Sequence, residues 1–221
     1  LLKPNKGVGK MYLKILFSSL KPLIIIVFLT SCSLPVSVFE SRGCKTQAYI
    51  DLGVIDSINP RNVKGNVASL VIYPFEVQAN FTRGDRNFGL QIAERFHAEM
   101  LKESESFILV LNADADWDGK REEFFTGNHG AIRQAQAQGY RHVMVGYLEA
   151  VKEDSLGLFT KIIDANQGIT LWSGYTTVST NQRAVRRNLS SAYMSTRRPD
   201  IYSFDVMAQD LAECAVYSIF N

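Results

Sequence analysis

The chain has 221 residues, a formal net charge of +2 and 46% apolar residues. Five of the 24 basic residues and none of the 22 acidic residues lie within residues 1–31, so the rest carries 19 basic against 22 acidic side chains. The basic excess is therefore confined to the N-terminal stretch and gives no evidence for nucleic-acid binding. The remaining length suits one domain with its own core, and no later stretch is apolar enough for a membrane-spanning helix.

Residues 1–31 contain a leader of the secretory type. Lysines precede the apolar run 22–29, which is too short for a stop-transfer helix, and two small residues and Cys32 follow it. This layout is typical of a signal peptide. We expect the signal peptide to begin at Met11, with residues 1–10 as upstream sequence or an alternative start, and we exclude this stretch from the fold prediction.

The end of the leader, residues 29–32, resembles the lipobox of bacterial lipoproteins: an apolar residue, two small residues and Cys32. The resemblance implies thioether lipidation of Cys32, cleavage before it, and acylation of the new amine with a fatty acid such as palmitate. Several acyl chains anchor a protein stably, whereas one anchors it only marginally. Ser33, where an aspartate would favour the inner membrane, favours the periplasmic face of the outer membrane. The alternatives are a cleaved signal with an incidental cysteine, or an uncleaved anchor.

Residues 32–66 are mixed in composition and only weakly periodic, with turn-forming residues at 56–60. We interpret them as a lipidated tether that separates the anchor from a domain spanning residues 67–221. The alternative is an additional packed strand, which Tyr49 and Ile50 could supply.

The domain is predicted to alternate strands and helices before it ends in hairpins and a helix. Continuous apolar runs predict a central strand and a short buried strand, and apolar residues at helical spacing predict the helices. Alternating segments separated by turns predict three antiparallel strands. The predicted strands are 68–77, 107–111, 142–150, 156–164 and 169–178; the predicted helices are 88–103, 130–138 and 201–220; a polar loop is predicted at 112–129.

The element order is thus β-α-β-α-β-β-β-α. The helix between the first two strands predicts a parallel crossover, and the hairpins extend the sheet in antiparallel fashion. The predicted fold class is α+β: a single domain with a mixed sheet of about five strands and helices packed on it.

After Cys32 the only cysteines are Cys44 and Cys214. An even pair outside the cytoplasm predicts a disulfide, which would join the start of the mature chain to the last helix. Such a bridge requires the two Cα atoms to lie within about 7 Å. The alternative is two separate thiols, one of them buried.

Two further features are candidate sites. Asp114, Asp116 and Asp118 follow the spacing of a calcium loop, but Phe125 stands where a bidentate glutamate is needed, so we expect a solvated loop and no metal. An arginine-rich segment near the end of the chain has the composition of a partner interface, and the alternative is a mobile basic loop. Its interface candidates are Arg183, Arg186, Arg187, Tyr193, Arg197 and Arg198.

Three segments, 71–75, 139–146 and 164–172, carry a resemblance to a known family. They are similar to the first strand, the strand after the second helix and the "D-x-x-T-G" hairpin of periplasmic lipoproteins. The body of these proteins is like the N-terminal domain of TolB and the core of the curli-export lipoprotein CsgG. Asn166 and Gln167 depart from the hairpin pattern, and no insertion is long enough for the membrane-spanning strands of the curli pore.

The resemblance implies a binding protein without cofactor or reaction. We expect a non-enzymatic outer-membrane lipoprotein that is a structural or assembly subunit of an envelope machine, such as a secretion-system outer-membrane complex or a flagellar outer ring. Its partners would be the membrane, through the lipid, and other envelope proteins, including copies of itself in a ring, with no nucleic acid or small-molecule substrate. The alternative is a lipoprotein that regulates a periplasmic enzyme such as a peptidoglycan synthase.

Overall fold

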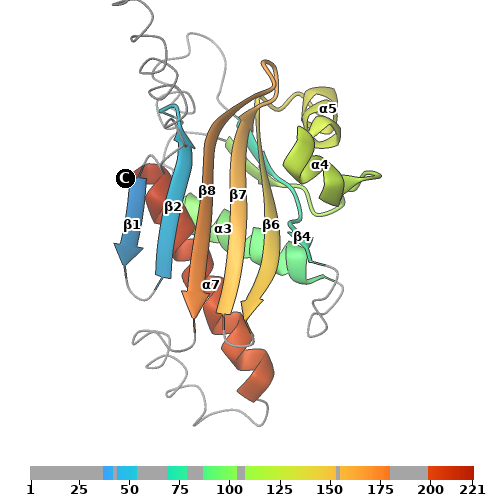
Figure 1. Ribbon diagram of the computed structural model, residues 1–221. Coiled ribbons are helices and arrows are strands. Elements are labelled where there is room, and N and C mark those ends of the chain that lie inside the picture. Colours follow the sequence, from blue (N-terminus) through green and yellow to red (C-terminus); the bar gives the residue numbers. More distant parts are fainter. Residues whose placement is uncertain are drawn as a thin grey trace, which may run out of the picture. The chain divides into compact units, whose positions relative to one another are not determined.

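The structure is a computed structural model, and it describes residues 37–41, 44–53, 69–78, 87–103, 108–152, 155–179 and 199–221. Among these residues the chain forms one mixed sheet of eight strands with four helices packed on it, which confirms the α+β class (Figure 1). None of the described helices combines the length and the apolar content needed to cross a bilayer. The strands are β1 (Ser37–Ser41), β2 (Cys44–Asp51), β3 (Ser69–Ile72), β4 (Glu76–Val77), β5 (Ile108–Leu111), β6 (His142–Lys152), β7 (Ser155–Asp164) and β8 (Ile169–Ser179); the helices are α3 (Phe88–Glu103), α4 (Lys120–Thr126), α5 (His129–Ala137) and α7 (Pro199–Phe220).

The strand order is β1-β2-β8-β7-β6-β3-β5, and β4 also pairs with β6. Strand β3 runs parallel to both β5 and β6, as a helical crossover from β3 to β5 requires. The other strands from β6 to β1 pair in antiparallel fashion, and β6, β7 and β8 follow one another through short turns. The predicted parallel start and the predicted hairpins are both confirmed.

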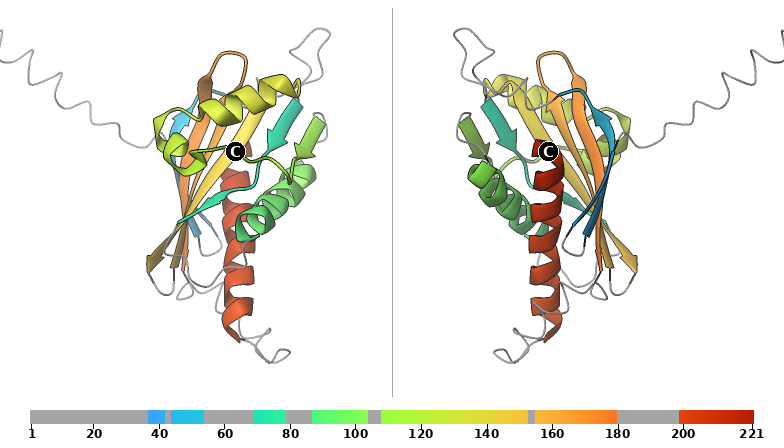
Figure 2. Two further views of the ribbon diagram at one scale, coloured as in Figure 1. Left: turned by 90° about the vertical axis from the view of Figure 1, so that its right-hand side faces the viewer. Right: turned by 90° about the vertical axis from the view of Figure 1, so that its left-hand side faces the viewer.

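Helices cover the two faces of the sheet unequally. Helices α3 and α7 pack on one face, and α4 and α5 pack on the other, where they lie over β6 and its neighbours (Figure 2). Along β3 and the residue after it this division follows the strand alternation. Leu70 and Ile72 join the core under α3 and α7, whereas Val71 and Tyr73 join the core under α4 and α5. All four side chains are fully buried, as predicted for a central strand.

Pro74 interrupts the predicted first strand and separates β3 from β4. The break lets the amide N–H of Phe75 donate to the carbonyl oxygen of Gly89, at 3.1 Å. A Cβ atom at Gly89 would lie 1.8 Å from the carbonyl oxygen of Phe75, so only glycine allows α3 to approach the backbone between β3 and β4 this closely.

The tether prediction is wrong for Ser37–Ser41 and Cys44–Asp51, which form β1 and β2 of the sheet, and the alternative of an additional packed strand holds there. The described body therefore begins near Ser37 and not at residue 67. Strand β2 is easy to miss because its inward side chains are small or polar: Cys44, Thr46 and Ala48. The buried hydroxyl of Thr46 is satisfied by a hydrogen bond with that of Thr176 across the sheet, at 2.9 Å.

Two smaller predictions also need correction. Strand β5 is an edge strand of the sheet, at the end opposite β1, and it is not fully buried, since Ile108 is 50% exposed. The predicted polar loop 112–129 contains α4, whose only buried residue is Phe124. A seven-residue helix with one buried side chain has no apolar periodicity for a sequence pattern to detect.

Candidate functional site: an open sheet face

Several predicted site residues lie outside the described residues. These are the lipidation candidate and the arginine-rich interface candidates: Cys32, Arg183, Arg186, Arg187, Tyr193, Arg197 and Arg198. Their roles stay predictions.

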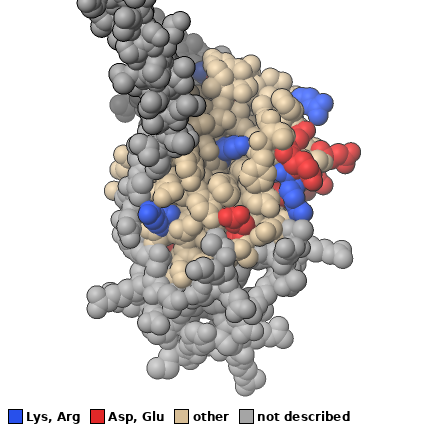
Figure 3. All heavy atoms as spheres, viewed as in Figure 1, with Lys and Arg blue, Asp and Glu red and all other residues tan. Residues whose placement is uncertain are grey.

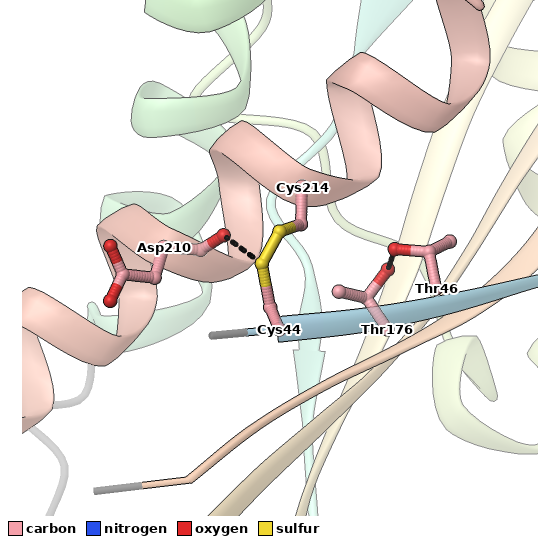
Figure 4. Close-up of a disulfide and its surroundings, with 5 residues drawn as sticks. All are labelled: Cys44, Thr46, Thr176, Asp210 and Cys214. Carbon is pink, nitrogen blue, oxygen red and sulfur yellow. Dashed lines mark hydrogen bonds between the residues drawn. A yellow bond between two sulfur atoms is a disulfide. The ribbon is translucent and has the colours of Figure 1, made fainter. Parts of the chain in front are cut away.

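Cys44 and Cys214 form a disulfide that joins β2 to α7 (Figure 4). Their Cα atoms are 6.4 Å apart, within the range that a bridge allows, and 170 positions separate them in sequence. The Cys44 sulfur also lies 3.6 Å from the carbonyl oxygen of Asp210, one turn before Cys214. The disulfide therefore fixes α7 against β2, in the stretch that was predicted to be a tether.

The calcium hypothesis does not fit the geometry of the loop that holds Asp114, Asp116 and Asp118. All three side chains are exposed, and Asp116 accepts the amide N–H of Trp117 instead of facing a shared centre. Among the described residues no group of three histidine, cysteine or acidic side chains could hold a metal ion. The loop instead leads into α4.

Strands β2, β8, β7 and β6 present one face on the side opposite α3 and α7, and we call this surface the open face. In Figure 1 it lies toward the viewer, beside α4 and α5, with α3 and α7 behind the strands. On this side no described helix covers β8, and α4 reaches β7 through the contacts of Phe124 and Phe125. Figure 3 shows that the face carries few charged side chains and that acidic groups gather at its edge near α4.

An aromatic row crosses the open face at right angles to the strands. Strand register places Phe159 of β7 directly between Tyr147 of β6 and Tyr175 of β8. Phe125 of α4 adds a fourth ring, with centroid distances of 5.0 Å to Tyr147 and 6.2 Å to Phe159. Phe125 is 59% exposed, Phe159 and Tyr175 are half-buried, and Tyr147 is nearly buried. Edge-on and tilted ring pairs of this kind stabilise one another.

The position of Tyr175 depends on a glycine in the neighbouring strand. A Cβ atom at Gly157 would lie 2.2 Å from the Tyr175 hydroxyl oxygen, so the phenol lies directly against the backbone of β7. The ring crosses β7, and its hydroxyl donates to a carboxylate oxygen of Glu149 on β6 at 2.7 Å. Phe159 stacks on the same ring with a centroid distance of 4.2 Å. Burial, and then the bond to Glu149, raises the pKa of Tyr175.

Lys161 ties α4 to the sheet beside the aromatic row. Its ammonium donates to the carbonyl oxygen of Phe124 and lies 4.5 Å from the centroid of the Phe124 ring. Burial lowers the pKa of Lys161. Because these contacts hold the C-terminal end of α4 on β7, they also fix the neighbouring Phe125 above the sheet.

Polar side chains flank the aromatic row on both sides. Strand register places Glu149 and Thr177 on one side, and Lys161 and Ser173 on the other. On β2 the row continues into Gln47, which lies opposite Tyr175 and accepts a hydrogen bond from the hydroxyl of Tyr49 at 3.2 Å. The open face therefore combines exposed ring surface with hydrogen-bonding groups at its borders.

A separate groove of about 330 Å³ lies where β3 ends, between the start of α3 and the start of α4. Its lining is mixed in charge, with Glu76, Asp114, Asp116 and Lys120 beside apolar residues. Glu76 is paired with Arg121 at 3.0 Å, and burial lowers the pKa of Lys120. The groove therefore carries charged side chains of both signs at its rim. Among the described residues that line it, none forms a pair of nucleophile and general base.

The aromatic row was not predicted from the sequence. Phe159 and Tyr175 both lie in predicted strands, but their meeting depends on strand register, and Phe125 lies in a helix that was not predicted. Pairing the predicted hairpin about its turn, with Asp164 opposite Ile169, would place Phe159 opposite Gly174. The irregularity between Ile162 and Ile163 shifts the register by one residue and brings Tyr175 opposite Phe159, and no sequence pattern shows that shift.

The comparisons with known proteins give weak likenesses only. The sequence matches no family model and no curated protein. A point variant of the PelC dodecamer from Paraburkholderia phytofirmans is 13% identical with a TM-score of 0.41, over 70% of this chain and 90% of that one.

Two further solved structures show a similarly weak likeness. Lipoprotein GNA1162 from Neisseria meningitidis is 15% identical with a TM-score of 0.35, over 57% of this chain and 94% of that one. TolB from Acinetobacter baumannii is 11% identical with a TM-score of 0.35, over 58% of this chain and 27% of that one. At these values the likeness carries no argument about function, and the resemblance to the curli-export lipoprotein stays a prediction.

Proposed function

We propose that this chain is a lipid-anchored, non-enzymatic structural or assembly subunit of a bacterial cell-envelope machine, on the periplasmic face of the outer membrane. Two features of the chain support the location. The leader ends in the lipobox-like residues 29–32, and the Cys44–Cys214 disulfide suits an oxidising compartment outside the cytoplasm.

The observation that carries a binding role is the open face. One side of the sheet is covered by α3 and α7, whereas on the other side α4 reaches β7 only at its edge and no described helix covers β8. Large apolar side chains remain exposed on it, above all Phe125 at 59%, with Tyr49 at 38%. Contiguous exposed ring surface with a polar border is typical of a surface that another molecule covers.

The proposal is tested on the full chain expressed in a Gram-negative host and extracted from membranes in mild detergent. Size-exclusion chromatography with light scattering should show a complex of high mass in which envelope partners, or further copies of the chain, are present in fixed ratio. The Cys32→Ser variant should leave the membrane fraction, because the lipid is the predicted anchor.

Other outcomes separate the alternatives. A monomer that copurifies with a periplasmic enzyme and changes its rate would favour the regulator function over the structural one. A solitary monomer with no retained partner would contradict both, and retention of Cys32→Ser in membranes would contradict the lipid anchor.

A further inference from the structure

We infer that the aromatic row of the open face binds a linear glycan, with sugar rings stacked on Phe125 and Phe159 and hydroxyl groups bonded to the polar border. The inference rests on the proposed function only in placing the chain in the cell envelope. The proposed function treats the open face as a binding surface without specifying a ligand, and the inference specifies one.

The shape of the row fits an extended chain of rings. Across β6, β7 and β8 the row forms a strip in which Phe125 is exposed and Phe159 and Tyr175 are half-buried, with the centroids of these last two rings 4.2 Å apart. Tyr147 is nearly buried and packs against Phe125, with a centroid distance of 5.0 Å. Strand register and the contact of Tyr175 with Gly157 fix this strip, so its rings need not be ordered when a ligand binds. A preorganised surface loses less conformational entropy on binding.

The chemistry of the border also fits a sugar polymer. A pyranose ring offers apolar C–H groups on its faces and hydroxyl groups at its rim. The open face matches this division, because ring surface lies in the middle and Gln47, Thr177 and Ser173 lie beside it. The hydroxyl groups of Thr177 and Ser173 and the amide of Gln47 are neutral, and each can both donate and accept a hydrogen bond.

The charge of the face argues against a strongly charged polymer. Lys161 is held by the carbonyl oxygen and ring of Phe124, and Glu149 accepts the hydroxyl of Tyr175. Among the described residues, Figure 3 shows few charges over the strands and an acidic cluster near α4, so these residues offer no basic patch to a nucleic acid or an anionic lipid surface. A neutral or weakly charged glycan matches such a surface.

The test measures binding of chitohexaose and cellohexaose, two β-1,4-linked glycans, to the detergent-solubilised full chain by isothermal titration calorimetry. We expect at least one of them to bind. Phe125→Ser should weaken its binding about threefold to tenfold, because an aromatic contact contributes about 0.5–1.5 kcal/mol. Phe125 is exposed, so its replacement should not unfold the chain.

Leu101→Ser is the matched control, since Leu101 is 50% exposed on α3, which packs on the other face. It should bind as the unaltered chain does. A second variant, Phe159→Leu, keeps the apolar volume while removing the ring, and it should also weaken binding.

Three results would overturn the inference: no binding of either glycan, equal weakening by Phe125→Ser and Leu101→Ser, or loss of the envelope complex in Phe125→Ser while glycan binding is unchanged. The last result would make the open face a protein interface. Glycan binding that persists in a chain without any envelope complex would instead contradict the proposed function alone.

Discussion

At the scale of single residues, Asp210 is the clearest case of a side chain whose charged form is destabilised by the fold. Its carbonyl oxygen faces the disulfide, whereas its carboxylate points away from the bridge (Figure 4). One carboxylate oxygen is buried without a hydrogen-bond partner among the described residues. Burial, and then the charge of Glu213, raises the pKa of Asp210 to about 6.

The raised pKa predicts that Asp210→Asn stabilises the protein near neutral pH. The folded pKa lies above the unfolded value of 3.8, so this carboxyl favours folding below pH 3.8 and loses that contribution as pH rises through about 6. After a discount for the partial exposure of the group, we expect the asparagine to raise the free energy of unfolding by about 1 kcal/mol above that pH.

The measurement is urea unfolding of both proteins across this pH range. The difference between them should vanish at the acid end, because the carboxyl is then neutral in both states. Asp118→Asn, which alters an exposed carboxylate, serves as the control and should show no comparable change. An Asp210→Asn variant that is less stable at neutral pH would mean that the carboxylate makes a favourable contact.

At the scale of secondary-structure elements, α5 depends on a residue of the preceding helix. Asn128, at its N-cap, has a left-handed backbone and makes no side-chain capping bond. Instead, Glu123 of α4 accepts the amide N–H of Gly130 at 2.6 Å. A carboxylate at this end of a helix both satisfies a free N–H group and interacts favourably with the helix dipole.

We therefore predict that Glu123→Ala lowers the free energy of unfolding by about 1 kcal/mol, the usual cost of losing a helix cap. Glu122→Ala is the matched control, because Glu122 lies in the same turn of α4 and its side chain is exposed. Chemical denaturation of the two variants measures the difference. Equal stabilities would show that the carboxylate of Glu123 does not act as the cap.

The elements that the sequence predicted correctly are those with a large apolar stripe or a clear alternation. Helix α3 buries Ile92, Phe96 and Met100 at helical spacing, and β7 buries Leu156, Leu158 and Ile162 on one side. The turn between β7 and β8 also follows its sequence, since Asp164 accepts the amide N–H groups of two following residues.

The elements that were missed lack such stripes. Strand β2 is held by pairing with β8, by a hydroxyl bond at Thr46 and by the bridge at Cys44, none of which shows as an apolar pattern. The aromatic row was missed for a related reason. A row across three strands and a helix exists only after strand register and the position of α4 are known.

At the scale of the whole molecule, the disulfide joins the two ends of the described body. Strand β2 lies near its start and α7 is its last helix, so the loop between Cys44 and Cys214 contains every described element except β1. Helix α7 is also held to α3 by polar contacts, in which Arg95 bonds to Gln209 at 3.0 Å and Gln209 bonds to Glu99 at 2.6 Å. The disulfide therefore joins α7 to β2, and these polar contacts join it to α3.

Because the loop is long, the bridge should contribute strongly to stability. In the chain-entropy model, closing 170 residues restricts the unfolded chain by about 5 kcal/mol, and native bridges typically contribute about 2–5 kcal/mol. We predict that the double variant Cys44→Ala, Cys214→Ala loses stability within this range. The β1–β2 pair should loosen first, since of the described helices only α7 packs against β2.

Urea unfolding with and without a reductant measures the global effect, and amide hydrogen exchange locates it. The reductant should destabilise the unaltered protein to the level of the double variant and leave the variant unchanged, which separates loss of the bridge from any effect of the alanines. Exchange should quicken at Thr46 and Ala48 of β2 before it quickens at Val71 of the central strand. Uniform quickening across the sheet would show instead that β2 and the centre of the sheet open as one unit.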